Sequence, residues 1–330
     1  MTLPLIIVNP ASAGGATGAG WARVASDVRE HFGAFECAFT RGAGDARVIA
    51  AREARAGRRL IVACGGDGTI SEVAGGILES GADAELGVLP SGTGGDFRRT
   101  LRMPAGARDA AAALRGGGTV EIDAGRVEFE NESGGREARH FVNAASCGMG
   151  GEVIRRLKGG GAAALPARGA SLLGGRASYA LASAQAALSF DNPRLRVTLD
   201  DGRERQVVVA NLCVANARYF GGGMKIAPGA KLTDGLFDVI AVGDLGALSI
   251  FANAHRLYLG THLRMDQVHH ARARKISVGL AGEGGVKVLL EVDGELVGSL
   301  PTTFEILPAA LRVRAPAQAS APCPKKFSRT

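Results

Sequence analysis

One stretch decides the fold of this chain: Ile61-Val62-Ala63-Cys64-Gly65-Gly66-Asp67-Gly68-Thr69. Its apolar start predicts a buried strand, and the run Ile70–Leu78 that follows predicts a helix. Glycines between a strand and a helix let the backbone approach a polyphosphate closely, whereas Asp67 would repel one unless Mg²⁺ intervenes. A tight turn with Asp67 as the helix N-cap explains the carboxylate but leaves three glycines without a role. A phosphate-binding loop is therefore the favoured interpretation.

Two further glycine-rich turns follow apolar runs in the same way. Asn9-Pro10-Ala11-Ser12-Ala13-Gly14-Gly15 follows the run Leu5–Val8, and Leu89-Pro90-Ser91-Gly92-Thr93-Gly94-Gly95-Asp96-Phe97 follows the run Leu86–Leu89. Taken alone, the first of these is more typical of an ordinary turn. The carboxyl ends of neighbouring parallel strands meet at one edge of a sheet, so the three turns together predict a single crevice. The chain has no GxxxxGK[ST] and no GxGxxG with an acidic residue at the usual distance, which argues against a P-loop enzyme and a dinucleotide oxidoreductase.

The order of the apolar runs predicts two domains. In the first third, strands alternate with helices, which is typical of an α/β domain with a parallel sheet; the strands are expected at 5–8, 60–64 and 86–89 and the helices at 21–32, 47–56 and 70–78. From about Val120 the runs are shorter and alternate with polar turns, which predicts a mainly antiparallel β-sandwich with helical insertions near 170–190 and 245–263. We therefore expect an α/β domain at 1–122, a β-sandwich at 123–312 and a disordered tail at 313–330.

Composition limits the class of protein and its partners. The chain has 330 residues, 46% of them hydrophobic, and a net charge of +7 that favours an anionic partner. The basic residues are scattered and not interleaved with aromatic ones, which argues against nucleic acid. Five widely spaced cysteines without metal-ligand spacing are typical of a reduced cytoplasmic protein. No apolar run approaches the roughly 18–20 residues needed to span a bilayer, so we expect membrane contact to be peripheral. The sequence is compatible with a homodimer.

The three turns resemble the nucleotide-binding loops of diacylglycerol kinases and of the wider lipid-kinase family, which includes sphingosine, ceramide and bacterial lipid kinases. The middle turn is also similar to that of NAD kinases and phosphofructokinases, and this implies an N-terminal domain of their fold. The resemblance implies ATP as phosphate donor and Mg²⁺ as cofactor. It assigns the nucleotide to a set of loop residues: Asn9, Pro10, Ser12, Thr40, Gly65, Gly66, Asp67, Gly68, Thr69, Ser71, Gly92 and Thr93. The chain departs from the family at Gly95, which stands where an asparagine is usual.

The resemblance continues into the second half of the chain. The segment Phe141–Gly150 is similar to the family's FxNxxSxGxxA motif, and Phe220–Met224 with Ala227–Asp238 is similar to its GGGMxxAPxAxLxDGxxD block. In bacterial members this block holds a structural Mg²⁺. By position, the ligands implied here are the backbone oxygens of Lys231 and Leu236 and the carboxylate of Asp234. Without the resemblance, residues 231–236 are a plain turn.

The segment Leu290-Glu291-Val292-Asp293-Gly294-Glu295 supplies the implied catalytic base. Composition alone favours a solvated Asp-Gly hairpin here. The resemblance implies that Glu295, with Asp293 beside it, takes the proton of a lipid hydroxyl. It also implies that the catalytic Mg²⁺ is held, directly or through water, by Asp67, Asp96 and Asp123. The implied reaction is transfer of the γ-phosphate of ATP to a hydroxyl of a lipid such as diacylglycerol at a membrane surface.

Two other functions stay open on the sequence. A nucleotide kinase of the NAD-kinase type would share the middle turn and a second β domain, but the only Asn-Glu pair, Asn131-Glu132, lies in a polar hairpin. A non-catalytic nucleotide-binding protein is the other alternative. The chain retains the acidic residues that an enzyme of this kind needs, which argues against it: Asp67, Asp96, Asp293 and Glu295.

Overall fold

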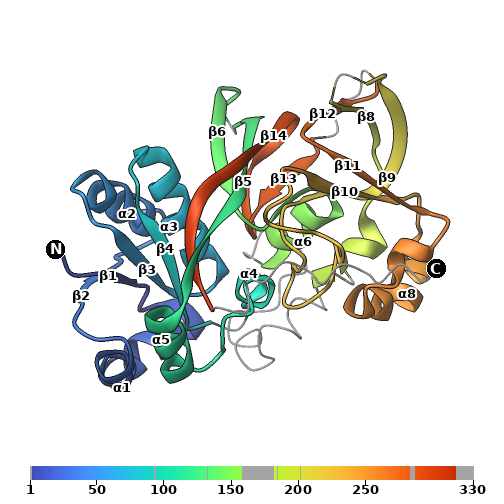
Figure 1. Cartoon of the computed structure of the whole chain (residues 1–330). Helices are drawn as coiled ribbons and strands as arrows, with labels where there is room; N and C mark the ends of the chain where they lie inside the picture. Colours follow the sequence, from blue (N-terminus) through green and yellow to red (C-terminus); the bar gives the residue numbers. More distant parts are fainter. Residues whose placement is uncertain are drawn as a thin grey trace, which may run out of the picture.

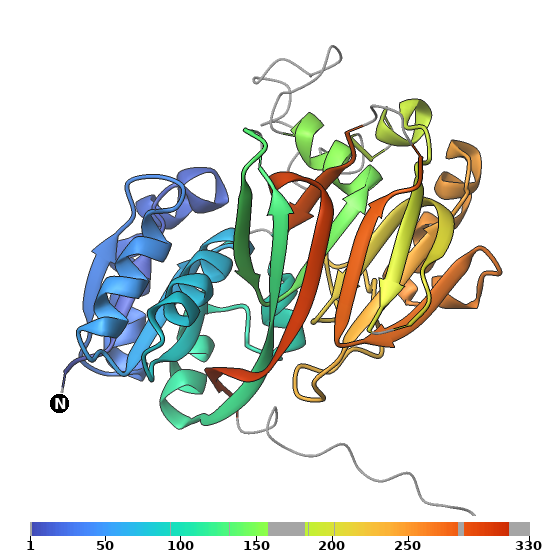
Figure 2. The ribbon, with the colours of Figure 1, turned by 90° about the horizontal axis from the view of Figure 1, so that it is seen from above.

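The computed structural model describes residues 2–92, 94–131, 133–157, 182–183, 185–200, 202–282 and 287–316. An α/β half and an antiparallel β half lie side by side, and two long strands run between them (Figures 1 and 2). This arrangement confirms the expected α/β domain followed by an antiparallel β domain. Within the described ranges, no helix combines the length and the apolar character needed to cross a bilayer.

Four strands form the sheet of the first half in the order β4-β3-β1-β2, and their pairings are parallel; they are β1 (Leu5–Val8), β2 (Glu36–Phe39), β3 (Leu60–Gly65) and β4 (Glu85–Pro90). Every residue of β1 and β3 is buried because helices cover both faces of the sheet. The helices α2 (Asp45–Arg55) and α3 (Asp67–Ser80) lie on one face, and α1 (Ala16–His31) and α5 (Ala107–Gly116) lie on the other (Figure 1). The strand β2 was not predicted, because its short and largely exposed run carries no clear apolar pattern.

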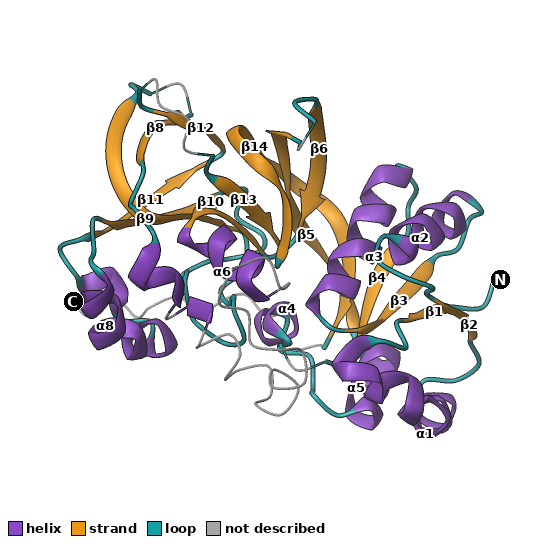
Figure 3. Ribbon diagram, turned by 180° about the vertical axis from the view of Figure 1, so that it is seen from behind, coloured by secondary structure: helices purple, strands orange, loops and turns teal. Residues whose placement is uncertain are grey.

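The second half is built from antiparallel strands; they are β6 (Arg136–Phe141), β7 (Ala144–Gly148), β8 (Arg194–Leu199), β9 (Arg205–Ala215), β10 (Phe237–Gly243), β11 (Val268–Ala273), β12 (Lys275–Leu280) and β13 (Leu289–Val292). Two helices, α6 (Met149–Leu157) and α8 (Ala247–Leu259), lie on the same side of this sheet (Figure 3). The helix α8 confirms the insertion predicted near 245–263. Most of the insertion predicted near 170–190 lies outside the described residues. The strand β11 was missed because His269, His270 and Arg272 interrupt its apolar pattern.

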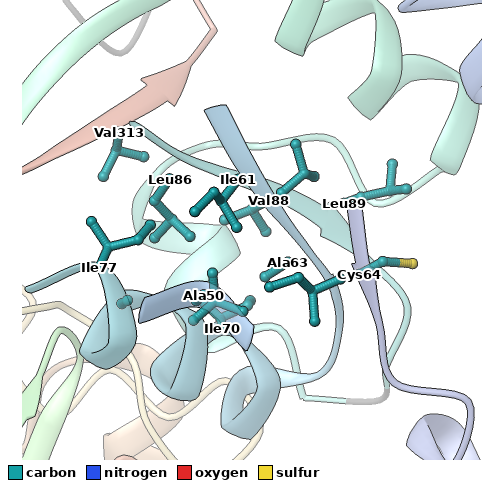
Figure 4. Close-up of a cluster of buried hydrophobic side chains, with 14 of the residues drawn as sticks. Ala50, Ile61, Ala63, Cys64, Ile70, Ile77, Leu86, Val88, Leu89 and Val313 are labelled. Carbon is teal, nitrogen blue, oxygen red and sulfur yellow. The ribbon is translucent and has the colours of Figure 1, made fainter. Parts of the chain in front are cut away.

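The strands β5 (Gly118–Glu130) and β14 (Glu295–Ala315) hold the two halves together. They pair with each other over most of their length, and the far end of β14 adds to the first sheet by parallel pairing of Val313 with Leu86. Figure 4 shows Val313 beside Leu86, Ile61 and Ile77 in the core of the first half. The tail predicted to begin at residue 313 therefore begins too early, since the alternating apolar side chains keep the strand buried to Ala315. Residues 317–330 lie outside the described part.

The helices α2 and α3 approach each other closely at Gly76. A Cβ atom built at Gly76 would overlap the backbone oxygen of Arg47 and would lie 2.9 Å from the Cβ of Ala50. Well-packed interiors do not absorb extra atoms without shifting backbone or side chains. The close packing of these two helices therefore depends on a glycine at position 76.

We predict opposite effects for two glycine-to-alanine changes in helices. Gly76→Ala should lower the free energy of unfolding by about 1–3 kcal/mol, because the added methyl group overpacks the contact between the two helices. Gly20→Ala, in α1, should raise it by about 0.5–1 kcal/mol, because nothing lies within 4 Å of the added carbon and alanine favours the helix. Urea unfolding of both variants measures the two values. Equal effects of the two changes would contradict the assigned packing.

Candidate active site

Hydrogen bonds join the three glycine-rich turns into one structure. The Asn9 side chain of the first turn donates from Nδ2 to Thr69 Oγ1 of the middle turn, at 3.0 Å. The backbone N–H of Ser91, in the third turn, donates to the oxygen of Gly65 in the middle turn, also at 3.0 Å. The sequence predicted that these turns meet at one edge of the sheet, and the structure brings them together there.

Hydroxyl groups link the first turn to the third. Ser12 Oγ and Thr17 Oγ1 each donate to the backbone oxygen of Ser91 at 3.0 Å, and Thr17 Oγ1 lies 2.6 Å from Ser91 Oγ. Thr17 is buried and was not predicted as part of the site, although its place at the start of a helix after a glycine-rich turn was a usable signal. The hydroxyl of Ser12 is used to hold the loops in place.

Glycines allow the middle and third turns to touch through their backbones. A Cβ atom at Gly92 would lie 2.7 Å from the Cα of Gly66, and one at Gly94 would overlap the Asp67 carboxylate. Gly95 has a φ of 69°, in the left-handed region. Asparagine also adopts this conformation more readily than most residues. Gly95 thus has a backbone conformation that the asparagine usual in the family could also adopt.

A first cavity, of about 280 Å³, lies where the first and middle turns meet, and we call it the nucleotide-side cavity. It is lined by Asn9, Pro10, Ala11, Thr40, Arg41, Gly42, Ala43, Ala46, Gly68, Thr69, Glu72 and Glu295. The structure therefore brings five residues of the predicted nucleotide set to one cavity: Asn9, Pro10, Thr40, Gly68 and Thr69. Ser71 is not among the lining residues, because its side chain hydrogen bonds to Asp293 instead. Thr93 lies outside the described residues.

A second cavity, of about 230 Å³, lies on the other side of the middle turn, between the two halves of the chain, and we call it the acceptor-side cavity. Four acidic residues line it: Asp67, Asp96, Glu291 and Asp293. The rest of its wall is formed by Gly94, Asn143, Ala144, Gly150, Ile154, Phe220, Gly221, Gly222 and Gly294. The middle turn thus contributes Asp67 to one cavity and Gly68 and Thr69 to the other.

Asp67 and Asp96 are close enough to influence each other's charge. Burial, and then the charge of Asp67, raises the pKa of Asp96 from 3.8 to about 6. Asp96 is held by the Arg99 guanidinium at 2.8 Å and by the N–H of Gly222 at 2.8 Å. Two neighbouring carboxylates that repel each other fit a divalent cation with oxygen ligands. The described residues contain no group of three or more His, Cys, Asp or Glu side chains placed to hold a metal.

Asp123 does not line the cavity that contains this pair. Asp123 is buried, and its two carboxylate oxygens accept the backbone N–H groups of Gly235, at 2.7 Å, and Ala309, at 2.9 Å. It is not among the residues that line either cavity. The carboxylate of Asp123 thus holds the 231–236 turn against β14, and its place in a metal network with Asp67 and Asp96 stays a prediction.

The two residues predicted to act as the general base, Asp293 and Glu295, line different cavities. Asp293 lines the acceptor-side cavity, and its carboxylate accepts three backbone N–H groups, from Val142, Asn143 and Ala144, at 3.0–3.1 Å. Burial raises its pKa from 3.8 to about 6 despite these hydrogen bonds. Glu295 lines the nucleotide-side cavity, and its Oε2 accepts from Arg139 Nη1 at 3.0 Å.

Glu291 is the acidic residue of the site that sequence reasoning missed. It is buried within β13, where Oε2 accepts from Ser146 Oγ at 2.8 Å and Oε1 accepts from the N–H of Gly294. Burial raises its pKa from 4.5 to about 7. A carboxyl group between Leu290 and Val292 in an apolar strand was the available signal, because such burial is costly without a function.

The implied structural metal site lies in the turn between Lys231 and Leu236. Asp234 Oδ1 is buried and has no hydrogen-bond partner among the described residues, while Oδ2 is paired with Arg272. A buried carboxylate oxygen without a donor fits a cation ligand. The guanidinium of Arg272 already offsets part of the charge that such a cation would meet.

The chain matches two family models that together span both halves. The diacylglycerol kinase catalytic domain matches residues 4–127, and the YegS C-terminal NAD kinase beta sandwich-like domain matches residues 160–315. A protein of Mycobacterium tuberculosis named diacylglycerol kinase is 31% identical over 279 residues, which cover 83% of this chain and 82% of that protein. The chain belongs to the diacylglycerol kinase family. Membership makes it a lipid kinase, a phosphotransferase with an alcohol group as acceptor, and implies ATP as the phosphate donor.

Two further relatives agree with this assignment. A protein of Staphylococcus saprophyticus named diacylglycerol kinase is 29% identical over 283 residues, which cover 84% of this chain and 83% of that protein. A crystal structure of a diacylglycerol kinase from Bacillus anthracis superimposes with a TM-score of 0.68 at 20% identity, over 96% of this chain and 98% of that one. The structural likeness shows that the two chains share the fold.

We predict that Glu291 makes the stability of this kinase fall as the pH rises. Because its pKa is raised in the folded state, folding favours the neutral carboxyl, and this stabilisation is full below pH 4.5 and is lost as the pH rises through about 7. The free energy of unfolding of Glu291→Gln should therefore exceed that of the wild type by an amount that grows from pH 5 to pH 8, to about 1–3 kcal/mol. Urea unfolding at several pH values measures this difference. A constant difference would show that Glu291 ionises as readily in the folded as in the unfolded chain.

Proposed function

We propose that this protein transfers the γ-phosphate of ATP, with Mg²⁺, to a hydroxyl group of a membrane lipid such as diacylglycerol. The observation that carries the proposal is the double role of the middle turn. Gly68 and Thr69 line the nucleotide-side cavity, and Asp67, the residue before them, lines the acceptor-side cavity. A phosphate held at this turn would face a hydroxyl in the second cavity, as positioning for in-line transfer requires.

The nucleotide phosphates would bind the backbone of the joined turns. Exposed N–H groups in glycine-rich turns suit phosphate oxygens, and the start of α3 at Asp67 adds the partial positive charge of a helix N-terminus. The side chains that we assign to the nucleotide are those of Asn9, Thr40 and Thr69, together with Arg41, which also lines the cavity and which the sequence did not indicate. The curated relatives are named diacylglycerol kinase, which favours a lipid over NAD as the acceptor.

Asp67 and Asp96 would hold the catalytic Mg²⁺. The ion would neutralise charge on the phosphates when bound. Asp234, with the backbone oxygens of Lys231 and Leu236, would hold the structural ion, and this assignment is supported by the unpaired Oδ1 of Asp234.

Glu295 is our candidate for the group that takes the proton of the acceptor hydroxyl. Its Oε1 is adjacent to the middle turn, since a Cβ atom built at Gly68 would lie 3.8 Å from it. Arg139 binds its other oxygen and orients the carboxylate. Asp293, whose carboxylate accepts three backbone N–H groups, positions residues 142–144, of which Asn143 and Ala144 line the acceptor-side cavity. We keep Asp293 as a second candidate for the general base because it lines that cavity.

A bilayer is the proposed partner, and exposed apolar side chains indicate the surface that meets it. Nine large hydrophobic residues are exposed in the described ranges, and six of them lie on α6, on the helical residues 185–189 or on α8: Leu157, Leu188, Leu248, Phe251, Tyr258 and Leu259. Hydrogen bonds link these segments: Arg156 Nη2 donates to Ser189 Oγ at 2.7 Å, and Asn192 Nδ2 donates to Asp244 Oδ1 at 2.8 Å. An apolar patch of this kind marks an interaction surface.

This face also borders the acceptor-side cavity. Ile154 of α6 lines that cavity, and α8 carries no acidic side chain that an anionic bilayer would repel. A bilayer on this face would place lipid headgroups beside the opening. We therefore propose peripheral docking of a cytoplasmic protein through α6 and α8.

We predict that Asp67→Asn loses at least about 100-fold in lipid phosphorylation, because one of the two metal-holding carboxylates is removed. The measurement is transfer of labelled γ-phosphate from ATP to an extracted lipid mixture in detergent micelles, with and without Mg²⁺. Asp109→Asn is the matched control, since Asp109 is exposed on α5 and far from either cavity lining. An active Asp67→Asn enzyme, or label on a soluble nucleotide instead of a lipid, would overturn the assignment.

We also predict that the exposed apolar residues of α8 contribute to vesicle binding. Leu248→Ser together with Phe251→Ser should weaken binding to anionic vesicles at least about tenfold, because two side chains no longer enter the interface. Val48→Ser is the control, since Val48 is 63% exposed on α2, on the other half of the chain. Sedimentation with vesicles at low and high salt measures both variants. Binding that is the same at both salt concentrations would exclude the electrostatic contribution expected from the net charge of +7.

A further inference from the structure

Two buried side chains that line the acceptor-side cavity, Glu291 and Asn143, can accept more hydrogen bonds than the described residues donate to them. The carboxyl group of Glu291 forms no ion pair with a basic side chain in the described part of the chain. Asn143 lines the same cavity and is 7% exposed, and its Oδ1 has no hydrogen-bond partner among the described residues. Buried acceptors without donors are costly, so native proteins usually satisfy them with a residue, a water or a ligand.

The position of Glu291 is fixed by the backbone around it. Glu291 is paired directly across from Ser146, where β13 meets β7, and the pairing of β13 with β14 shifts register between Leu290 and Glu291. Irregular pairing of this kind redirects a side chain and is common next to active sites. Gly150 closes the other side, because a Cβ atom there would lie 2.5 Å from Ser146 Oγ. The carboxyl group is therefore held in one position.

We infer that Glu291 and Asn143 form a subsite for a second hydrogen-bond donor on the acceptor lipid, a hydroxyl or an ammonium group next to the hydroxyl that receives the phosphate. The inference rests on the proposed lipid-kinase function and adds a substrate class to it. Such a donor would supply the missing partner of Asn143 Oδ1 and a further hydrogen bond to the Glu291 carboxyl group, whose two oxygens each accept one from the protein.

The charges around Glu291 favour a donor over an anionic group. Asp293 is close enough to Glu291 to raise its pKa, and burial, followed by the charge of Glu291, raises the pKa of Cys213. None of these groups carries positive charge, so an anionic headgroup would be repelled at this end. With a pKa near 7, the Glu291 carboxyl can accept a hydrogen bond in either protonation state.

The test compares three acceptors of equal chain length in detergent micelles. These are 1,2-diacylglycerol, with one hydroxyl, 1-monoacylglycerol, with two adjacent hydroxyls, and a long-chain 2-amino-1-alkanol, with a hydroxyl and an ammonium group. The quantity measured is kcat/KM for each acceptor, with the wild type, Glu291→Ala, Glu291→Gln and the control Glu305→Gln. Glu305 is an exposed carboxylate on β14, outside both cavity linings.

The wild type should prefer at least one acceptor with a second donor, and Glu291→Ala should reduce that preference at least about tenfold. A purely structural role would lower kcat/KM for all three acceptors alike and leave the ratio unchanged. Glu291→Gln distinguishes the two donors, because an amide oxygen can still accept from a hydroxyl but cannot neutralise an ammonium group. Glu305→Gln should leave the ratio at the wild-type value.

The inference is overturned if the wild type uses the three acceptors equally, or if both Glu291 variants keep the wild-type ratio. In those cases the lipid-kinase function itself stands, because phosphorylated lipid is still formed. Phosphorylation of none of the three lipids would instead reject the proposed function and the subsite with it. Thermal unfolding shows whether Glu291→Ala folds. If it does not, the ratio of kcat/KM between the acceptors is measured with Glu291→Gln and Asn143→Ser, and that ratio tests the inference.

Discussion

The backbone contact between the middle and third glycine-rich turns is the constraint on which the site depends. Gly66 and Gly92 approach so closely that a Cβ atom on Gly92 would lie 2.7 Å from the Cα of Gly66. This contact holds the ends of β3 and β4 together and leaves Asp67 at the boundary between two cavities. Parallel strands bring such turns to one edge of a sheet, and glycines allow the turns to merge there into one surface of N–H groups.

Buried carboxyl groups join the two halves of the enzyme, and they differ in what satisfies them. Asp123 and Asp293 are surrounded by backbone N–H groups from distant segments, so they act as clamps between loops. Asp96 is held by Arg99 and by the N–H of Gly222 in the second half. Glu291 accepts from one hydroxyl and one N–H group and has no basic side chain as a partner in the described part of the chain.

The long strand β14 explains why the two halves can share a site between them. It begins at Glu295, beside the middle glycine-rich turn, and crosses the β half. Its last residues, which include Val313, lie in the core of the α/β half. Because β5 pairs with it through most of this path, the two strands fix the distance between the halves. The cavity walls contributed by Asp67 and by Asp293 are therefore held in register by hydrogen-bonded strands and not by a flexible linker.

The sequence by itself determined the α/β domain, its three glycine-rich turns and part of the nucleotide-side cavity. These depend on short patterns, an apolar run and the residues that follow it, so local rules were sufficient for Asn9 and Thr69, whereas Thr40 follows the unpredicted strand β2 and was assigned by the family resemblance. The tertiary structure alone decided the roles of the acids. Asp123 is bound by N–H groups more than 100 residues further along the chain, and Glu291 was recognised only once its partner Ser146 and the cavity around it were in place. Whether a carboxylate clamps a loop or lines a cavity depends on contacts between distant segments, and no local pattern encodes them.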